Sequence, residues 1–265
     1  MTTPDRFFPT LARDPRDAAP FAVTPRHLAG PGDPRHITHY LSAAGWRDHS
    51  VPRYPHVLLE APDRRTRLTL EPGAENPITS NPVAWQLHGT VQHWYAAFSS
   101  LTPVEIIAGF TDTLTGPPPA AAPGVSDVLA ERGWSEHYRG IESMASDEED
   151  VLLSREDDES WLIEAGTPHP AGGIHKVMWE ARLVGQVPAH ALAGLAATLS
   201  APQPLLRHQT NIIHPKAVIR NTEVQGEDLQ RRHERRLASA RTAARTARRP
   251  APPALKAAAP PGRTR

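Results

Sequence analysis

Apolar residues recur at helical spacing in the first part of the chain. Ile37, Tyr40 and Leu41 stand at positions i, i+3 and i+4, which places them on one face of an amphipathic helix. Asp33 precedes them as a suitable N-cap, and Gly45 follows them with the left-handed conformation that commonly ends a helix. The pattern therefore predicts a first helix between Asp33 and Gly45.

Strand-like patterns follow this helix. Leu68 and Leu70 alternate with polar residues, so they lie on one face of a predicted strand. With three similar stretches, strands are predicted over residues 57–60, 66–71, 83–88 and 94–99. Thr102 and Glu105 then have the spacing of a capping box, which predicts a helix that ends at Gly116.

The same order of elements occurs a second time. Leu41–Trp46 returns as Leu129–Trp134, 88 residues later. The further matches, in order, pair 57–59 with 151–153, 68–71 with 161–164, the strand at Trp94 with 177–179, and 102–117 with 187–202. The sequence therefore predicts an α+β fold of two related units, each a small, mainly antiparallel sheet with flanking helices. These units are either two similar domains or two halves of one pseudo-symmetric domain.

Changes in composition mark the boundaries of the units. The predicted organisation is a flexible N-terminal segment (1–20), a first unit (21–117), a Pro/Ala linker (118–124), a second unit (125–204), a docking segment (205–222) and a basic helical or disordered tail (223–265). A short strand is predicted at residues 21–23, and residues 211–214 and 217–219 are predicted to be either a final strand or a docking segment.

The net charge of zero conceals an asymmetry along the chain. Residues 1–230 carry a net charge of −10 and residues 231–265 carry +10, so an acidic body bears a basic tail. The absence of cysteine excludes structural disulfides, zinc thiolate sites and thiol nucleophiles. No apolar run is long enough for a secretory signal or a membrane span, so we expect a cytoplasmic protein that does not bind membranes.

Motifs of known chemistry are missing from the sequence. It has no Gly-x-Ser-x-Gly elbow, phosphate loop or dinucleotide fingerprint, so no catalytic residue, cofactor or metal is predicted. Among the 14 histidines, His36 and His39 share a predicted helix face, and with His88 they are the ones to test as a site. The acidic clusters at 147–150 and 157–159 lack a calcium-loop pattern and predict a solvated rim or a surface for a basic partner, such as the tail.

The six tryptophans fall into two groups. Two pairs are equivalent between the units and are predicted to lie in the core: Trp46 with Trp134, and Trp94 with Trp179. Trp85 and Trp161 lie outside these pairs. If their rings are exposed, they are the predicted anchors of a contact with a partner, because buried aromatic rings dominate many interfaces.

The tail carries the most distinctive charge pattern. Its arginines recur at short intervals, so a helix distributes them over much of its surface: Arg231, Arg232, Arg235, Arg236, Arg241, Arg245, Arg248 and Arg249. Such a helix can bind phosphates without sequence preference, through the release of counterions. The same pattern also fits a solubilising tail, or a contact with a protein partner or with the body of this chain.

Several segments together resemble a known family. They are Pro25–Gly30, Gly32–Pro34, Ala44–Trp46, Tyr54–Leu59, Ala61–Asp63 and Thr102–Ile107. These resemble the tandem SPDY domain family, a domain-of-unknown-function family of actinobacterial proteins. The Ser-Pro-Asp turn of the name is Ala61-Pro62-Asp63 in the first unit and is replaced by 154–157 in the second. The resemblance implies a tandem architecture over about residues 20–203 and assigns no catalytic residue.

Two functions remain open at the level of sequence. The first is a non-catalytic cytoplasmic interaction module built from a duplicated unit, with an unknown protein partner. The alternative is a nucleic-acid-associated accessory protein that binds through its arginine-rich tail. An enzyme of another type requires a deep pocket with converging polar groups, and His36, His39 and His88 are its first candidates.

Overall fold

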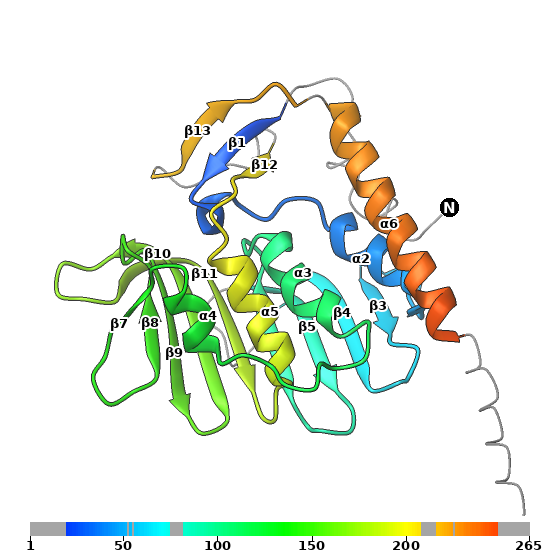
Figure 1. Cartoon of the computed structure of the whole chain (residues 1–265), viewed down its shortest axis with the longest axis horizontal. Helices are drawn as coiled ribbons and strands as arrows, with labels where there is room; N and C mark the ends of the chain where they lie inside the picture. The colour runs from blue at the N-terminus through cyan, green and yellow to red at the C-terminus, as the bar shows by residue number, and fades with distance from the viewer. Residues whose placement is uncertain are drawn as a thin grey trace, which may run out of the picture.

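One antiparallel sheet runs through both predicted units (Figure 1). The computed structural model describes residues 20–51, 53–54, 56–74, 82–207, 216–224 and 226–248. Within them, the strands of this sheet are β2 (Arg47–Asp48), β3 (Val57–Glu60), β4 (Thr66–Ala74), β5 (Val83–Gly89), β6 (Tyr95–Ser99), β7 (Ser135–Glu136), β8 (Ser143–Ala145), β9 (Val151–Asp157), β10 (Ser160–Pro168) and β11 (Ile174–Val184). Their spatial order is β2-β3-β4-β5-β6-β11-β10-β9-β8-β7.

The two units are the two halves of this sheet. Strands β2 to β6 form one half and β7 to β11 the other, and β6 pairs with β11, with Ala97 opposite Arg182. One hydrophobic cluster extends through both halves, from Ile37 to Leu199. The predicted α+β fold is therefore confirmed, and of the two arrangements left open, the chain adopts the single pseudo-symmetric domain.

Helices cover one face of the sheet (Figure 1). They are α2 (Arg35–Ala43), α3 (Val104–Thr113), α4 (Val125–Ala130) and α5 (Ala189–Leu199). Each repeat begins with a helix that ends at a glycine with positive φ, 93° at Gly45 and 85° at Gly133. The amide of the next residue then donates to the helix carbonyl five positions back, from Trp46 to Leu41 and from Trp134 to Leu129. The predicted helix end at Gly45 is confirmed.

The longer helices α3 and α5 cross at a glycine in each helix, so no side chain separates the two backbones there. A Cβ on Gly109 would lie 1.8 Å from Thr198 Oγ1, and a Cβ on Gly194 would lie 2.3 Å from the Gly109 carbonyl oxygen. The two helices share the pattern Gly-x-x-x-Thr, ending at Thr113 and Thr198. Glycine permits this close approach because it has no side chain, so the crossing joins the two halves on the helical side.

The matching of strands between the repeats was wrong by one strand. Strand β8 was not predicted, because Ser143-Met144-Ala145 is short and lies in a stretch interpreted as an insertion. With β8 equivalent to β3, strand β9 is the equivalent of β4, and β10 of β5. A Val-Leu-Leu sequence begins both β3 and β9, and this local identity produced the wrong match.

A second, smaller sheet lies beyond the ends of α3 and α5 (Figure 1). It consists of β1 (Phe21–Thr24), β12 (Leu205–Arg207) and β13 (Val218–Asn221), in the order β12-β1-β13. A short 3₁₀ helix, η2 (Arg26–Leu28), follows β1, and the last helix, α6 (Gly226–Arg248), lies along α2. The strand predicted at 21–23 is confirmed, and of the two alternatives for 217–219 the chain forms the strand, β13. The predictions for 1–19, 211–214 and 249–265 lie outside the described residues.

Candidate functional site

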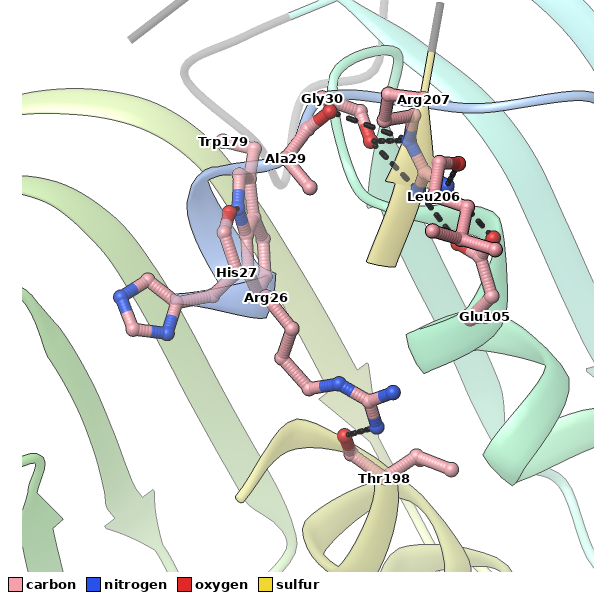
Figure 2. Close-up of polar contacts among 9 residues, drawn as sticks. All are labelled: Arg26, His27, Ala29, Gly30, Glu105, Trp179, Thr198, Leu206 and Arg207. Carbon is pink, nitrogen blue, oxygen red and sulfur yellow. Dashed lines mark hydrogen bonds and ion pairs between the residues drawn. The ribbon is translucent and has the colours of Figure 1, made fainter. Parts of the chain in front are cut away.

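Two arginine–carboxylate pairs attach outer segments to α3. In the first, between Arg207 and Glu105 (Figure 2), the arginine is buried. The side chain of Arg207, on β12, is 2% exposed. It donates to both carboxylate oxygens of Glu105, with 2.7 Å between Nη1 and Oε1, and to the backbone carbonyls of Ala29, Gly30 and Leu206. We call this contact of Arg207 with Glu105 the buried pair. It holds β12 and the loop after η2 on the helical layer.

The capping box predicted at the start of α3 does not form. Thr102 is buried and its hydroxyl lies 3.4 Å from that of Ser99, while Glu105 binds Arg207, and no side chain caps the helix. Leaving the buried guanidinium of Arg207 without a carboxylate would cost on the order of 3–5 kcal/mol. Loss of the side-chain cap at the start of α3 costs less, so Glu105 pairs with Arg207 and does not cap the helix. Burial alone raises the pKa of Glu105, but the charge and hydrogen bonds of Arg207 lower it to about 2.

The residues of η2 fix the N-terminal segment to the second half of the domain. Arg26 donates to the Thr198 carbonyl near the end of α5, and Trp179 donates its indole N–H to the His27 carbonyl at 2.7 Å (Figure 2). His27 Nε2 also lies 3.0 Å from Asp150 Oδ1 in the second half. The role of η2 is therefore to tie β1 to α5 and to both β11 and the β8–β9 turn.

Asp150 corrects part of the prediction of a solvated acidic rim. Residues 147–149 and 157–159 are exposed, but Asp150 is 3% exposed and accepts a hydrogen bond from Ser146 at 2.8 Å. Burial raises the pKa of Asp150, and the hydrogen bond and charge of His27 then lower it below its usual value. Since Ser146 donates to the carboxylate and not to the imidazole, this Ser, His and Asp set is not arranged for nucleophilic attack.

The second arginine–carboxylate pair attaches α6. Arg236 Nη2 donates to both oxygens of Asp112 at 2.8 and 2.6 Å, and Nη1 donates to the His36 carbonyl at 2.6 Å. Its guanidinium carbon lies 3.8 Å from the centre of the Tyr40 ring, a cation–π contact. Beside it, Leu237 and further along Ala240 are buried. We call the contact of Arg236 with Asp112 the α6 pair.

The docking of α6 changes the interpretation of its arginines. Arg236 faces the body and is engaged there, so it is not among the exposed candidates for nucleic-acid contact. Those with exposed side chains are Arg231, Arg232, Arg235, Arg241 and Arg245. Arg231 pairs with Glu227 and Asp228 on its own helix. The side chain of Arg248 and the whole of Arg249 lie outside the described residues.

The structure brings together only two of the three histidines singled out in the sequence. His233 of α6 lies against His39 and His36, with ring centroids 5.8 and 6.4 Å apart, whereas His88 packs on Tyr95 of β6 at 4.7 Å. Among the described residues, no group of three or more histidines and carboxylates is arranged to hold a metal ion. Burial lowers the pKa of His36 to about 4 and lowers that of His233, with smaller contributions from nearby charges.

The tryptophans lie in the interior. Trp85 and Trp161, predicted as partner anchors if exposed, have relative exposures of 3% and 9%, so they do not meet that condition. The corrected strand matching explains why, because Trp85 pairs with Phe98 on β6 and Trp161 takes the equivalent position opposite Leu183 on β11. The remaining four are also buried, as predicted: Trp46, Trp94, Trp134 and Trp179.

The helix-free face of the sheet holds a carboxylate pair that the sequence analysis missed. Glu164 on β10 lies directly opposite Glu180 on β11, and Arg182, two residues along, pairs instead with Glu156 at 2.6 Å. Burial raises the pKa of Glu164, and the charges of Glu180 and Glu156 raise it further. The signal in the sequence was a glutamate at corresponding positions of two apolar strands, which becomes visible only when the register is known.

The fold defines a class of protein: a duplicated α+β unit whose two copies close into one ten-stranded sheet. Its two halves match the SPDY family, a domain of unknown function (DUF317), over residues 60–120 and 140–205. The chain belongs to this family and carries its domain in tandem, as the sequence predicted. No curated protein and no solved structure matched the chain.

The matched segments do not include Arg207 or helix α6. They end at residue 205, before Arg207 and before the whole of α6. Helix α6 therefore lies outside both matched segments. None of the helices in the described residues has the length and apolar character that crossing a membrane requires.

Proposed function

We propose that the protein is a non-catalytic cytoplasmic interaction module. In this proposal the duplicated sheet is the scaffold and α6 is the binding element. The polar groups inside the body support this division, because they form two pairs that hold segments together. Arg207 binds Glu105, and His27 lies against Asp150. Their arrangement is that of structural contacts, without side chains converging on a shared substrate position.

The observation that carries the proposal is the orientation of α6. Arg236, Leu237 and Ala240 fix one side of the helix against α2 and α3, so in the docked state the rest of its surface faces solvent. This exposed surface presents four arginines, spread around it, without a carboxylate partner in the described hydrogen bonds and ion pairs: Arg232, Arg235, Arg241 and Arg245.

Nucleic acid is the partner class that this arginine surface favours. Guanidinium groups bind phosphates in a bidentate way, and several of them on one helix neutralise neighbouring phosphates. Helix α6 contains no Phe, Trp or Tyr, so base stacking is not expected and binding is predicted to be independent of sequence. An acidic protein surface is the second candidate, because the same cations recognise carboxylates.

The test compares two variants with equal changes in charge. In the first, Arg232, Arg235, Arg241 and Arg245 are replaced by glutamine. In the control, four exposed arginines away from α6 are replaced by glutamine: Arg53, Arg65, Arg132 and Arg139. Fluorescence anisotropy with random-sequence DNA and RNA over a salt series measures both affinity and the number of phosphates neutralised.

We expect the wild type and the control to bind duplex DNA with a steep salt dependence. The α6 variant loses binding, or its log–log salt slope becomes flatter by about 3 to 4, because each phosphate contact contributes about 0.9. Equal binding by the α6 variant and the control contradicts the assignment of α6 as the binding element. Binding of polyglutamate in place of nucleic acid identifies an acidic protein as the partner class.

A further inference from the structure

Three imidazoles meet where α6 lies on α2. His36 and His39 project from α2, and His233 projects from α6 with its ring centroid 5.8 Å from that of His39. The interface between the helices thus has titratable rings on both sides, one turn of α6 away from Arg236. Rings at this separation repel one another when they carry charge, and a partly buried site screens that repulsion less than water does.

The charges that surround these rings are mainly arranged in pairs. Groups face the rings from α3, β12, α6 and the start of α2: Asp33, Arg35, Glu105, Asp112, Arg207 and Arg236. Every carboxylate in this set is bonded to an arginine, since Asp33 binds Arg35, Glu105 binds Arg207 and Asp112 binds Arg236. A proton added to His36 or His233 therefore meets carboxylates whose charge an arginine has already compensated.

We propose that α6 is released from the body by protons: protonation of His36 and His233, whose rings meet at this interface beside His39, drives the helix away from α2. Release exposes the rings to water, where their positive charges are solvated. It also frees Arg236, so the cationic surface of α6 grows by one arginine and one imidazolium. If α6 is the binding element proposed above, acidification strengthens its binding of polyanions; the release itself does not depend on that function.

The direction of the effect follows from linkage. The docked state favours neutral rings, because burial lowers the pKa of His36 to about 4 and also lowers that of His233. Groups with a lowered pKa in the docked state stabilise docking fully above about pH 6.5, and that contribution is lost as the pH falls. Full return of His36 to its ordinary pKa on release corresponds to a change in the docking equilibrium of about 300-fold at most.

Asp112 acts in the opposite direction and so helps to separate the causes. Burial raises the pKa of Asp112 against the influence of Arg236. A carboxyl group with a raised pKa binds its proton more tightly in the docked state, so its protonation favours docking. Release on acidification therefore has to come from the histidines and cannot come from this carboxylate.

The experiment uses the absence of cysteine from the chain. Ala240→Cys places a single thiol under the docked helix, where Ala240 is 5% exposed, and Ala238→Cys places one on the exposed side of the same helix. Rates of labelling by a maleimide are measured in the full-length protein from about pH 7.5 to about pH 4.5. The ratio of the two rates removes the pH dependence of the thiol itself, and tryptophan emission reports whether the body stays folded.

At about pH 7.5 we expect Ala240→Cys to be labelled at least about tenfold more slowly than Ala238→Cys, and the ratio to rise towards one as the histidines titrate. Replacing His36, His39 and His233 with glutamine should keep the ratio low throughout. If that variant fails to dock at neutral pH, His233→Gln alone should still shift the midpoint to lower pH. A wild-type ratio that stays constant, or a pH response that His233→Gln leaves unchanged, overturns the proposal. Because labelling involves no nucleic acid, its result is independent of the proposed binding function.

Discussion

The buried pair and the α6 pair use the same chemistry at opposite ends of one helix. Glu105 stands in the first turn of α3 and binds Arg207, while Asp112 stands in its last turn and binds Arg236. The pKa values of the two carboxylates nevertheless shift in opposite directions. The pKa of Glu105 falls to about 2, whereas that of Asp112 rises above its usual value.

The surroundings of each pair account for the difference. Arg207 is almost fully buried, and three backbone carbonyls satisfy the donors that Glu105 leaves free. Glu105 also lies at the positive end of the α3 dipole, whereas Asp112 lies at the negative end, where a carboxylate is disfavoured by about 0.3–1 kcal/mol. Glu105 is 24% exposed, close to Arg236 at 22% and Asp112 at 31%, so the pairs differ in exposure through the burial of Arg207. The buried pair is therefore stable in the folded protein, whereas both partners of the α6 pair can exchange their contact for hydrogen bonds with water.

The largest effect should follow from breaking the buried pair. Arg207→Met removes the guanidinium and leaves the Glu105 carboxylate without its partner, so we expect the free energy of unfolding to fall by about 3–5 kcal/mol. Urea unfolding followed by tryptophan emission measures this loss.

A double substitution distinguishes the cost of the unpaired carboxylate from the cost of lost packing. Glu105→Gln combined with Arg207→Met removes both charges, so it should recover part of the stability that Arg207→Met alone loses. If the single and double variants lose equal stability, the cost arises from lost packing around β12 and not from the stranded carboxylate.

The next effect is on acid stability. A carboxyl group with a lowered pKa contributes stability that is present above its unfolded value of about 4.5 and is lost as the pH falls towards 2. Glu105 should therefore account for on the order of 3 kcal/mol of the stability lost over this range. Unfolding curves of the wild type and Glu105→Gln between about pH 5 and pH 2 provide the measurement. Parallel pH profiles in the two proteins would show that Glu105 is not held at a low pKa.

Local patterns in the sequence predicted much of the frame that carries these pairs. Alternation at Leu68 and Leu70 predicted β4, and Gly45 predicted the end of α2. The duplication predicted that the two halves are related. Each of these inferences depends on residues within one element or on one element compared with its copy, and such relations are contained in the order of residues.

The pairs themselves depend on contacts that the order of residues does not reveal. Glu105 and Arg207 are 102 positions apart, and at short range Glu105 matched a capping box better than an ion pair. The one available signal was an arginine directly after Leu205 and Leu206, in a short strand otherwise apolar. For α6, the sequence left a helix and a disordered segment as alternatives, and the side by which the helix docks depends on the contact of Arg236 with Asp112 on α3.

A smaller effect should follow from breaking the α6 pair. Arg236→Gln removes a partly exposed ion pair and the contact with Tyr40, so we expect a loss of about 1 kcal/mol in docking. Since the body does not depend on this pair, its unfolding midpoint should change little. Labelling of Ala240→Cys should become about fivefold faster at neutral pH in the Arg236→Gln background. Arg235→Gln, next to it on the exposed side, is the matched control and should leave the labelling rate unchanged.

The smallest effect tests the same physical rule away from α3. Glu164 resembles Asp112 in its raised pKa, but it faces another carboxylate, Glu180, across the sheet. A carboxyl group with a raised pKa favours the folded state only at low pH, and this contribution is lost as the pH rises through the folded pKa. At neutral pH, Glu164→Gln should therefore stabilise the protein by about 0.2–1 kcal/mol, because like charges directly opposite on neighbouring strands are destabilising.

Glu156→Gln, which removes a partner of Arg182, should give no such gain. Thermal unfolding at neutral pH distinguishes them, and a gain of equal size in both variants would assign the effect to net charge and not to the cross-strand pair.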